Sequence, residues 1–575
     1  AKTAGFCMGV RRAVEVALDA SNRTADPIYS YGPLIHNPQV LNILEEKGIS
    51  VIHAIPENGS GTAIIRAHGI PPNEREALAG AGFDIIDATC PKVIKVQSII
   101  AKHAKQGYAV IIIGDRAHPE VRGLMGYAGS NGYVAETMAE LEALPVFERA
   151  IIVAQTTQDT RLYTAVREWA GRHYPHYKVY ETICDSTERR QSEVQRLAES
   201  VDAVVVVGGR ESGNTQRLFE IAGRTGKPAF HVESEADLSR IDLDALRAAQ
   251  TIGITAGAST PNWVIRKVYM ALETMVFKRK SGWRQAVYSF LRLALLSNLY
   301  VSLGAAGLCY AATRLQGISD FTPFALIAFL YVQSMHILNH LTGSTADRFN
   351  EPDRARFYDD RKASLTVIAL SSGAAGLVIA YLQGWLPFLV LLVISLLGLS
   401  YRLTLIPKTL ASVVYRRIKD IPGSKTILIA LAWGVVTSVL PPISILGTYG
   451  AANIFIFAWS TALVFVRTAF FDILDMQGDR LVGKETIPIL LGEKRSLRLL
   501  KGMLAGLIVS LPVLSVLTPV PAFAISLSFC PAVMFAVLLA FEKSLLLPGV
   551  RLEFLVESHI GLAGVLALGW GLAGF

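Results

Sequence analysis

Three cysteines in the first half of the chain are the residues most able to carry out chemistry together. They are Cys7, Cys90 and Cys184, and the other two cysteines of the chain, Cys309 and Cys530, lie within apolar runs. Thiolates bind zinc and iron–sulfur clusters, and three thiolates leave one corner of a four-iron cluster open to a substrate. Because no two cysteines have CxxC spacing, three interpretations stay open: a cluster, a zinc site or three buried structural cysteines.

Three histidines form a second group. His36, His68 and His118 stand in the segments GPLIHNP, RAHGIPP and RAHPEV, each of which contains glycine or proline. Imidazoles combined with the hydroxyl and amide groups of the segments SGNT and AGAST can bind a polyanion such as a diphosphate. The alternative is that each histidine is a hydrogen-bonded core residue.

Glu120 lies two residues after His118. A carboxylate beside a diphosphate pocket is electrostatically unfavourable unless it carries a proton, so this position suggests a proton donor. The alternative is a solvated acid in a surface loop.

The elements that must position these residues are short β-branched strands alternating with amphipathic helices, for example at residues 93–105 and 191–199. This alternation predicts βα units and a mostly parallel sheet. Ligands bind beyond the carboxyl ends of parallel strands, and the candidate residues follow such ends. The expected strand-end residues are His68, Cys90, His118, Thr156, Cys184, Ser212 and Ser259.

These segments resemble the LytB family of iron–sulfur reductases. GFCMGVRRAV, GPLIHNP, RAHGIPP, DATCPKV, HPEV, AQTT, ICDST followed by RQ, SGNT and TAGAST occur in the family order over nearly the whole first half. The resemblance implies three α/β lobes around a [4Fe-4S] cluster held by Cys7, Cys90 and Cys184. It further implies that His36, His68, His118, Ser212, Asn214 and Ser259 bind a diphosphate substrate, and that Glu120 and Thr156 relay a proton. Gly213 departs from members that carry serine there.

The LytB resemblance also implies the reaction. Members of this family reduce 4-hydroxy-3-methylbut-2-enyl diphosphate to isopentenyl and dimethylallyl diphosphate, with electrons from a reduced ferredoxin or flavodoxin-type donor. A competing interpretation is an iron–sulfur redox sensor, which would not need the histidine, serine, asparagine and glutamate groups.

The second half of the chain is apolar. Runs long enough to approach or reach a bilayer crossing begin near residues 287, 321, 364, 385, 426, 451, 503, 521 and 555, which predicts about nine transmembrane helices. Basic residues concentrate in the loops after the even-numbered spans, so these loops and the first half are expected in the cytoplasm, at the inner membrane. The net charge of +8 therefore reflects membrane topology, and no nucleic-acid partner is expected. Residues 1–16 lack the apolar core of a signal peptide.

Three carboxylates mark the sixth predicted span. Asp472, Asp475 and Asp479 are spaced three and four apart, which places them on one helix face suited to Mg²⁺ and a diphosphate. The alternative is a solvated helix end. The segment FFDILDMQGDRLVGKETIP, together with the spans and basic loops, resembles the UbiA superfamily of intramembrane prenyltransferases.

The other metal motif of the UbiA superfamily follows the second span. Its equivalent here is NHLTGSTAD, in which Asn339 and Asp347 match the family pattern while His340 and Gly343 replace two carboxylates. Either a nearby carboxylate (Asp353, Asp359 or Asp360) compensates, or the acceptor chemistry differs, or the membrane half is a lipid-binding anchor.

The sequence thus predicts a reductase domain (residues 1–278), a basic linker (279–286) and a UbiA-like membrane domain (287–575). The membrane domain would use Mg²⁺ to transfer a prenyl group from a prenyl diphosphate to a lipid-soluble acceptor. The alternative is a reductase tethered to a non-catalytic membrane anchor.

Overall fold

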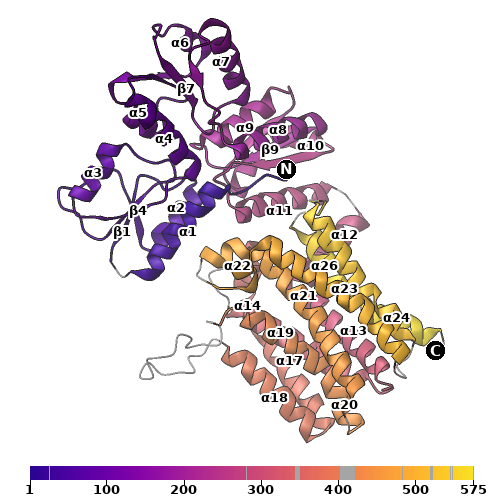
Figure 1. Cartoon of the computed structure of the whole chain (residues 1–575). Helices are drawn as coiled ribbons and strands as arrows, with labels where there is room; N and C mark the ends of the chain where they lie inside the picture. Colours follow the sequence, from indigo (N-terminus) through magenta and orange to yellow (C-terminus); the bar gives the residue numbers. More distant parts are fainter. Residues whose placement is uncertain are drawn as a thin grey trace. The chain divides into compact units, whose positions relative to one another are not determined.

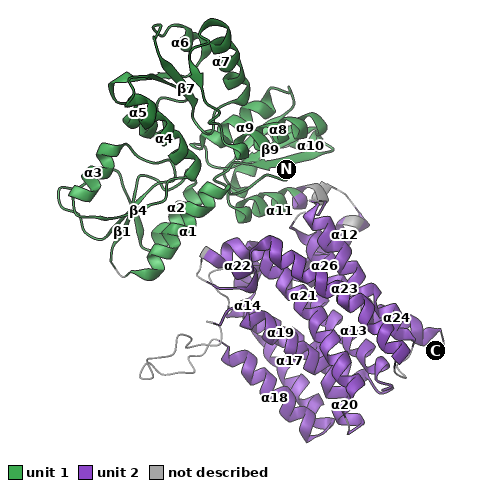
Figure 2. Cartoon of the chain, in the orientation of Figure 1, with its two compact units in different colours: residues 1–272 green, residues 273–575 purple. Residues whose placement is uncertain are grey.

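The computed structural model (Figure 1) describes residues 1–24, 26–279, 282–342, 350–401, 421–447, 449–481, 484–517, 522–543, 545–546 and 548–573. The chain divides into two compact units (Figure 2). The first unit is Ala1–Leu272 and the second is Glu273–Phe575.

The first unit contains three parallel sheets. The first has the order β2-β1-β3-β4, with β1 at Ile28–Tyr31, β2 at Ile49–Ile52, β3 at Thr62–Ile65 and β4 at Asp84–Asp87. The second has the order β6-β5-β7-β8, with β5 at Ala109–Ile113, β6 at Gly132–Ala135, β7 at Ala150–Ala154 and β8 at Lys178–Val179. The third has the order β10-β9-β11, with β9 at Ala203–Val207, β10 at Ala229–Val232 and β11 at Ile252–Ala256. The strands β3, β5, β7 and β9 are buried throughout, as expected for continuous apolar strands covered on both faces.

Helices connect and cover these sheets. They are α1 (Met8–Arg23), α2 (Pro38–Glu46), α3 (Pro72–Gly80), α4 (Pro91–Ala104), α5 (Pro119–Ala128), α6 (Met138–Glu142), α7 (Thr160–His173), α8 (Asp185–Ser200), α9 (Gly213–Gly223), α10 (Leu243–Ala248) and α11 (Asn262–Arg279). The predicted helices at residues 93–105 and 191–199 correspond to α4 and α8. Each helix begins before the first residue of its predicted amphipathic stretch. Pro91 suits a first helical turn, and the first turn of α8 is acidic, which complements the helix dipole.

The second unit is helical. Its helices are α12 (Trp283–Leu296), α13 (Leu299–Leu315), α14 (Thr322–Leu341), α16 (Pro352–Asp360), α17 (Lys362–Leu382), α18 (Trp385–Ser400), α19 (Ser424–Gly434), α20 (Leu440–Ile445), α21 (Ala451–Leu481), α22 (Ile487–Leu491), α23 (Glu493–Leu517), α24 (Phe523–Leu527), α25 (Phe529–Glu542) and α26 (Val550–Leu572). A π-helical turn, Val435–Val439, joins α19 to α20.

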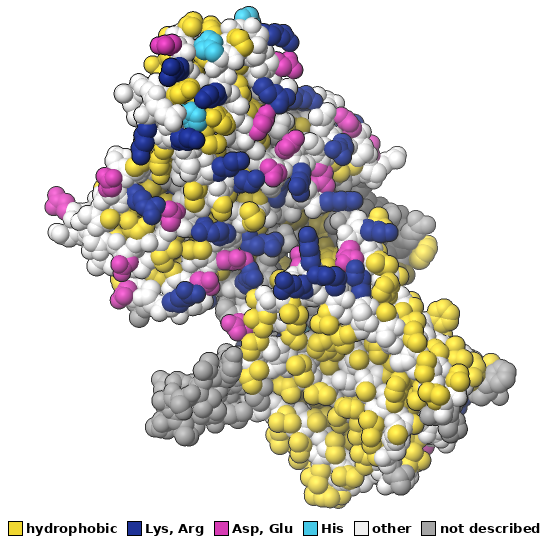
Figure 3. Space-filling model, viewed as in Figure 1, with side chains coloured by type: hydrophobic (Ala, Val, Ile, Leu, Met, Phe, Trp, Pro, Cys, Tyr) yellow, Lys and Arg dark blue, Asp and Glu magenta, His cyan; other side chains and the backbone are white. Residues whose placement is uncertain are grey.

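Within the described residues, seven helical segments are long and apolar enough to cross a membrane. An eighth results if α12 and α13, which meet at an angle of 74°, are counted as one span. The predicted total of nine would also require α18, a helix of only 16 residues, so the count of nine stays a prediction. Hydrophobic side chains dominate the visible surface of the second unit, whereas charged side chains are scattered over the first (Figure 3). The second unit is therefore a multi-pass membrane domain.

Candidate functional site

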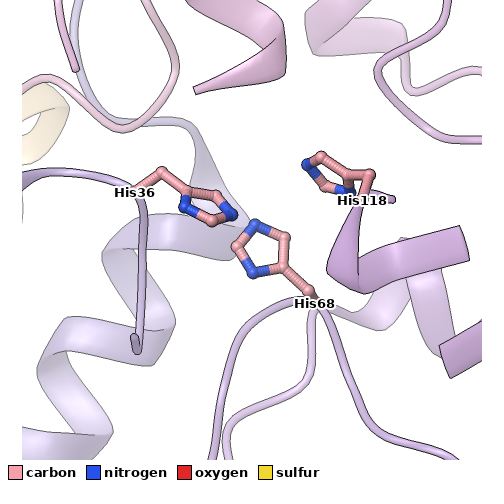
Figure 4. A group of neighbouring side chains, drawn as sticks. All are labelled: His36, His68 and His118. Carbon is pink, nitrogen blue, oxygen red and sulfur yellow. The ribbon is translucent and has the colours of Figure 1, made fainter. Parts of the chain in front are cut away.

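The three histidines predicted to bind substrate lie together in the first unit (Figure 4). His36 follows β1, His68 follows β3 and His118 precedes α5, so two sheets supply them. The ring centroids are separated by 4.6 Å (His36 to His68), 5.6 Å (His36 to His118) and 5.3 Å (His68 to His118). The carboxyl ends of the strands thus bring together residues that are far apart in the sequence.

Burial keeps these histidines uncharged. It lowers the pKa of His118 to about 4, and it lowers the pKa of His36 and, to a greater extent, that of His68. Neighbouring histidines and Arg66 lower the pKa values further in the same direction. At neutral pH the cluster therefore offers polar ring nitrogens without permanent positive charge.

Several polar atoms of this pocket have unmet hydrogen-bonding capacity. Both ring nitrogens of His36, the Nδ1 atom of His68 and the side-chain amide nitrogen of Asn214 are buried without a partner. The Ser259 hydroxyl donates to the His36 carbonyl at 3.1 Å and lies 3.2 Å from the Ser212 hydroxyl oxygen. Buried polar atoms without partners are rare in folded proteins, so this cluster indicates a ligand rich in acceptor atoms.

Glu120 and Thr156 form a buried pair, in contrast to the alternative of a solvated loop acid. The Thr156 backbone amide donates to Glu120 Oε1 at 2.7 Å, and the Thr156 hydroxyl donates to Glu120 Oε2 at 2.9 Å. Burial raises the pKa of Glu120 to about 7, although the Thr156 hydrogen bonds favour the charged form. A carboxyl group with this pKa can hold and release a proton at neutral pH.

Each candidate cysteine directly precedes a helix, and Cys90 and Cys184 follow strands of two different sheets. Cys90 follows β4 and precedes α4, Cys184 follows β8 and precedes α8, and Cys7 precedes α1. Helix amino termini favour thiolates through their partial positive charge.

Backbone hydrogen bonds hold the three cysteines beside the pocket loops. The amide of Cys90 donates to the Ala67 carbonyl at 2.9 Å, that of Cys184 to Thr156 at 3.0 Å, and that of Cys7 to Ala258 at 3.0 Å. Ala67 precedes His68, and Ala258 precedes Ser259. The cysteines are therefore hydrogen-bonded to the loops that carry His68, Thr156 and Ser259.

The three cysteine sulfur atoms do not form a compact single-ion site among the described residues. In the part of the chain that the structure describes, the set with metal-ligand atoms all within 4.8 Å of one another is the histidine cluster, not the cysteines. Three thiolates on one zinc ion, at about 2.3 Å each, would meet that limit. The arrangement disfavours a preformed three-cysteine zinc site. Cys7 and Cys90 are nevertheless near neighbours, because a Cβ atom built on Gly9 would lie 2.4 Å from the Cys90 sulfur.

Arg190 is a buried cation beside the cysteines that the sequence analysis did not single out as a site residue. Its guanidinium donates to the carbonyls of Gly5 (2.7 Å) and Ala256 (3.2 Å), which are neutral acceptors. Burial lowers the pKa of Arg190, while the negative charges of Cys7, Glu193 and Cys184 raise it. A buried guanidinium is stabilised by nearby negative charge, so a thiolate-bound cluster fits this position. The signal in the sequence was the RQ pair that follows ICDST.

Arg66 is a second residue that the sequence analysis missed. Its Nη1 atom packs against Gly32, because a Cβ atom built there would lie 2.4 Å away, and its Nε donates to the Gly69 carbonyl at 3.4 Å. The charge of Arg66 acts on all three histidines of the cluster. Arg66 thus provides permanent positive charge beside a pocket of neutral imidazoles. The sequence feature that could have identified Arg66 is its position two residues before His68.

In the second unit, the three aspartates lie along α21, and two of them are buried. Asp472 is buried and accepts a hydrogen bond from the Thr426 hydroxyl. Asp479 is also buried, and its Oδ1 atom lies 3.0 Å from Asn350 Nδ2 and 3.3 Å from Lys484 Nζ. Asp475, which lies between them on the helix, is partly exposed. The alternative of a solvated helix end does not fit the burial of Asp472 and Asp479.

The first metal motif is only partly described. Asn339 lies near the end of α14 and is half-buried, whereas Asp347 and Gly343 lie outside the described residues. Of the carboxylates considered as replacements, Asp353 pairs with Arg292 at 2.7 Å, and Asp359 and Asp360 are exposed.

Asn350 connects the segment after the first motif to the second motif. A Cβ atom built on Gly478 would lie 1.9 Å from Asn350 Oδ1, so the glycine in QGD makes room for this asparagine beside Asp479. The sequence analysis did not identify this contact, because the residues that form it are 129 positions apart.

A buried ion pair crosses the helical core of the second unit. Arg467 on α21 makes two hydrogen bonds to Glu557 on α26, and both side chains are less than a tenth exposed. The Arg467 guanidinium also lies 5.6 Å from the ring centroid of Trp433. Charged residues inside membrane helices are usually paired and oriented toward the protein interior, as here.

Comparison with known proteins identifies both parts of the chain. The LytB protein family matches residues 1–273, and the UbiA prenyltransferase family matches residues 300–547. The chain is similar to the 4-hydroxy-3-methylbut-2-enyl diphosphate reductase of Oleidesulfovibrio alaskensis, with 44% identity over 279 residues that cover 48% of this chain and 98% of the relative. The reductase of Aquifex aeolicus is 39% identical, over 47% of this chain and 93% of the relative.

Among solved structures, a UbiA homolog from Archaeoglobus fulgidus bound to GPP and Mg²⁺ is 16% identical and has a TM-score of 0.35, covering 49% of this chain and 98% of that one. The chain belongs to the LytB family through residues 1–273, fused to a UbiA prenyltransferase family domain at residues 300–547.

Proposed function

We propose that the first unit reduces 4-hydroxy-3-methylbut-2-enyl diphosphate to isopentenyl and dimethylallyl diphosphate. The reaction takes up two electrons and two protons and releases the hydroxyl oxygen as water. The observation that carries this proposal is the combination of three kinds of group near the ends of the strands: buried polar atoms without partners, a buried carboxyl group with a pKa of about 7, and three cysteines hydrogen-bonded to residues that follow strands of three different sheets. Identity of 44% to a reductase over nearly its full length supports it independently.

The diphosphate would bind to the groups that now lack partners. His36, His68 and Asn214 offer buried polar nitrogens, and Ser212 and Ser259 offer hydroxyl groups. Since the imidazoles are neutral, Arg66 would supply the permanent positive charge that attracts the anion. Because the positive charge comes from Arg66 and the imidazoles are neutral, the empty pocket does not contain several buried cations that repel one another.

Cys7, Cys90 and Cys184 would hold a [4Fe-4S] cluster, which supplies electrons and Lewis acidity when bound. Burial raises the pKa of the Cys90 thiol, so Cys90 is not an activated free nucleophile, and a coordinated metal would deprotonate it. Glu120 would deliver a proton, oriented by both hydrogen bonds from Thr156. His118 caps the same helix turn, because its Nδ1 accepts from the Glu120 amide at 3.1 Å.

The test is an anaerobic assay on full-length protein with a reduced ferredoxin or flavodoxin-type donor. Wild-type protein is expected to bind iron and sulfide and to form both C5 diphosphates, whereas Cys90→Ser is expected to lose turnover and most of the iron. Cys309→Ser is the matched control, because Cys309 is fully buried in α13, away from the pocket. Iron and sulfide binding without turnover in the wild type would favour the redox sensor instead.

We further propose that the second unit transfers a prenyl group from a prenyl diphosphate to a lipid-soluble acceptor, with Mg²⁺ bound by Asp472, Asp475 and Asp479 and by the Asn339 to Asp347 motif. The placement of all three aspartates along one helix supports this role, as does the UbiA family match. The unit would lie in the inner membrane, with the reductase in the cytoplasm.

Release of diphosphate from prenyl diphosphates tests the transferase. Full-length wild-type protein in lipid bilayers is expected to release it in the presence of Mg²⁺, and Asp475→Ala is expected to reduce release to background. The reductase activity of Asp475→Ala serves as an internal control, because the first unit should be unaffected. Wild-type protein that releases no diphosphate would favour the membrane anchor, an outcome that the engagement of Asp472 and Asp479 by protein groups would explain.

A further inference from the structure

Helix α12 carries a row of exposed apolar side chains along one face. Trp283 is 71% exposed, Val287 45%, Phe290 65% and Leu293 53%. Their spacing of four, three and three residues places them on one side of the helix. On the other side of the helix, Leu295 is buried. Helix α12 therefore has a packed face and a separate, exposed apolar face.

The length and direction of α12 do not fit a membrane crossing. Its 14 residues extend about 21 Å, which is shorter than the roughly 30 Å hydrocarbon core of a bilayer. The helix meets α13 at 74°. Asn298 at the junction has a left-handed backbone (φ 60°), a conformation that asparagine tolerates, so the chain turns sharply here. If α13 crosses the membrane, α12 runs nearly parallel to its plane.

Contacts with α16 hold α12 at the same end of the transmembrane helices as α16. Arg292 pairs with Asp353 at 2.7 Å, Asn298 Nδ2 donates to the Tyr358 hydroxyl at 2.6 Å, and Arg354 donates to the Leu295 carbonyl at 3.4 Å. Since α16 lies in the connection between the spans α14 and α17, it belongs to the membrane–water boundary. Its partner α12 must lie at the same boundary.

We propose that α12 is an interfacial helix that lies in the plane of the membrane, with Trp283, Val287, Phe290 and Leu293 inserted among the upper parts of the lipid acyl chains. Helices with an apolar face and a polar face bind the headgroup region in this way, with the apolar face about 5–10 Å deep. Tryptophan is enriched at this depth, and Trp283 is the first residue of the helix. The occupant of the exposed face is thus the lipid bilayer.

Depth-resolved photocrosslinking tests the proposal without changing the protein. Full-length protein is placed in phosphatidylcholine bilayers containing a phosphatidylcholine whose diazirine lies either next to the glycerol or at the end of an acyl chain. After irradiation and digestion, mass spectrometry should find the peptide containing α12 labelled several-fold more by the shallow probe than by the deep one. The region of Leu370, which is 60% exposed in the span α17, is the reference for deep labelling.

Two results would overturn the proposal. Labelling of α12 by the deep probe at the level seen for Leu370 would make α12 part of a broken span. An absence of labelling by either probe would mean that protein or water covers the face.

A pair of substitutions adds a second measurement. Phe290→Asp places a charge on the apolar face and should reduce shallow labelling of the helix several-fold. Ser289→Asp adds the same charge at the neighbouring exposed position off the row and should leave labelling unchanged. Equal labelling in both variants would show that the apolar face does not hold the helix at the membrane.

Discussion

The two candidate sites differ in how their buried polar groups are partnered. In the first unit, ring nitrogens of His36 and His68 and the amide of Asn214 are buried without partners. At the candidate metal site of the second unit, Asp472 and Asp479 are buried and accept hydrogen bonds from protein groups, although other polar atoms of that unit, such as His336 Nε2, are buried without a partner. An unpartnered buried group costs stability, so its retention indicates a ligand, whereas a satisfied group can serve the fold alone. The contrast makes the reductase pocket the better-defined site.

Substitution of Glu120 should produce the largest effect. Glu120→Gln removes the proton but keeps the size of the side chain, and kcat is expected to fall by about 10²- to 10⁴-fold, the usual contribution of a general acid. Product formation in single-turnover experiments with a pre-reduced protein measures this loss. Undiminished turnover would mean that the buried acid only stabilises the fold, and the contrast between the units would disappear.

The pH dependence of kcat tests the same role of Glu120 as proton donor. Because the pKa of Glu120 is about 7, the protonated form is lost as the pH rises through 7, and wild-type kcat should fall there. Thr156→Val removes the hydroxyl hydrogen bond that favours the charged form, so it should raise the pKa of Glu120 and move this fall to higher pH. A shift to lower pH would contradict the assignment.

Removal of one partner of the Arg467–Glu557 pair should destabilise only the second unit. Glu557→Gln leaves a buried guanidinium without its counterion, which typically costs about 3–5 kcal/mol. The thermal unfolding midpoint in detergent should drop, while the reductase kcat stays unchanged. Glu542→Gln, which removes the partly exposed pair with Lys501, is the control and should cost about 0–1 kcal/mol. Equal effects would indicate that the buried pair is not structural.

Arg66→Gln should raise the KM for the diphosphate substrate more than it lowers kcat. Loss of a charge-assisted hydrogen bond of about 1.5–3 kcal/mol corresponds to a rise in KM of about 10- to 100-fold, with kcat little changed. Arg75→Gln, on the exposed pair with Asp87, is the control and should leave KM unchanged. A fall in kcat at constant KM would place Arg66 in the chemical step instead.

Gly213→Ser should have the smallest effect. A Cβ atom at this position would lie 3.6 Å from the His118 ring, an ordinary contact, so the serine fits. One additional neutral hydrogen bond of about 0.5–1.5 kcal/mol would lower KM about two- to tenfold. A higher KM would show that the pocket has no room for a further donor.

The sequence was sufficient for the order of the strands and helices in the first unit, but not for every helix boundary or for the surroundings of each residue. Alternating strands and helices predicted the parallel sheets, and the residues after β3, β5 and β9 were correctly expected near strand ends. Arg190 and Arg66 were not identified as site residues, since the type of a residue does not reveal whether its charge is buried beside thiols or histidines. Hydropathy likewise gave a single apolar run from residue 287, because it does not detect the sharp turn at Asn298 between α12 and α13.

The backbone hydrogen bonds of the three cysteines have a consequence for assembly. The bonds join Cys90 to Ala67, Cys184 to Thr156 and Cys7 to Ala258, which follow strands of three different sheets, so a group bound by all three sulfur atoms would tie the three sheets together at one point. Binding of that group would then stabilise the arrangement of the three sheets in the first unit. Protein prepared without iron should be digested by protease between the sheets before it is digested within any of them.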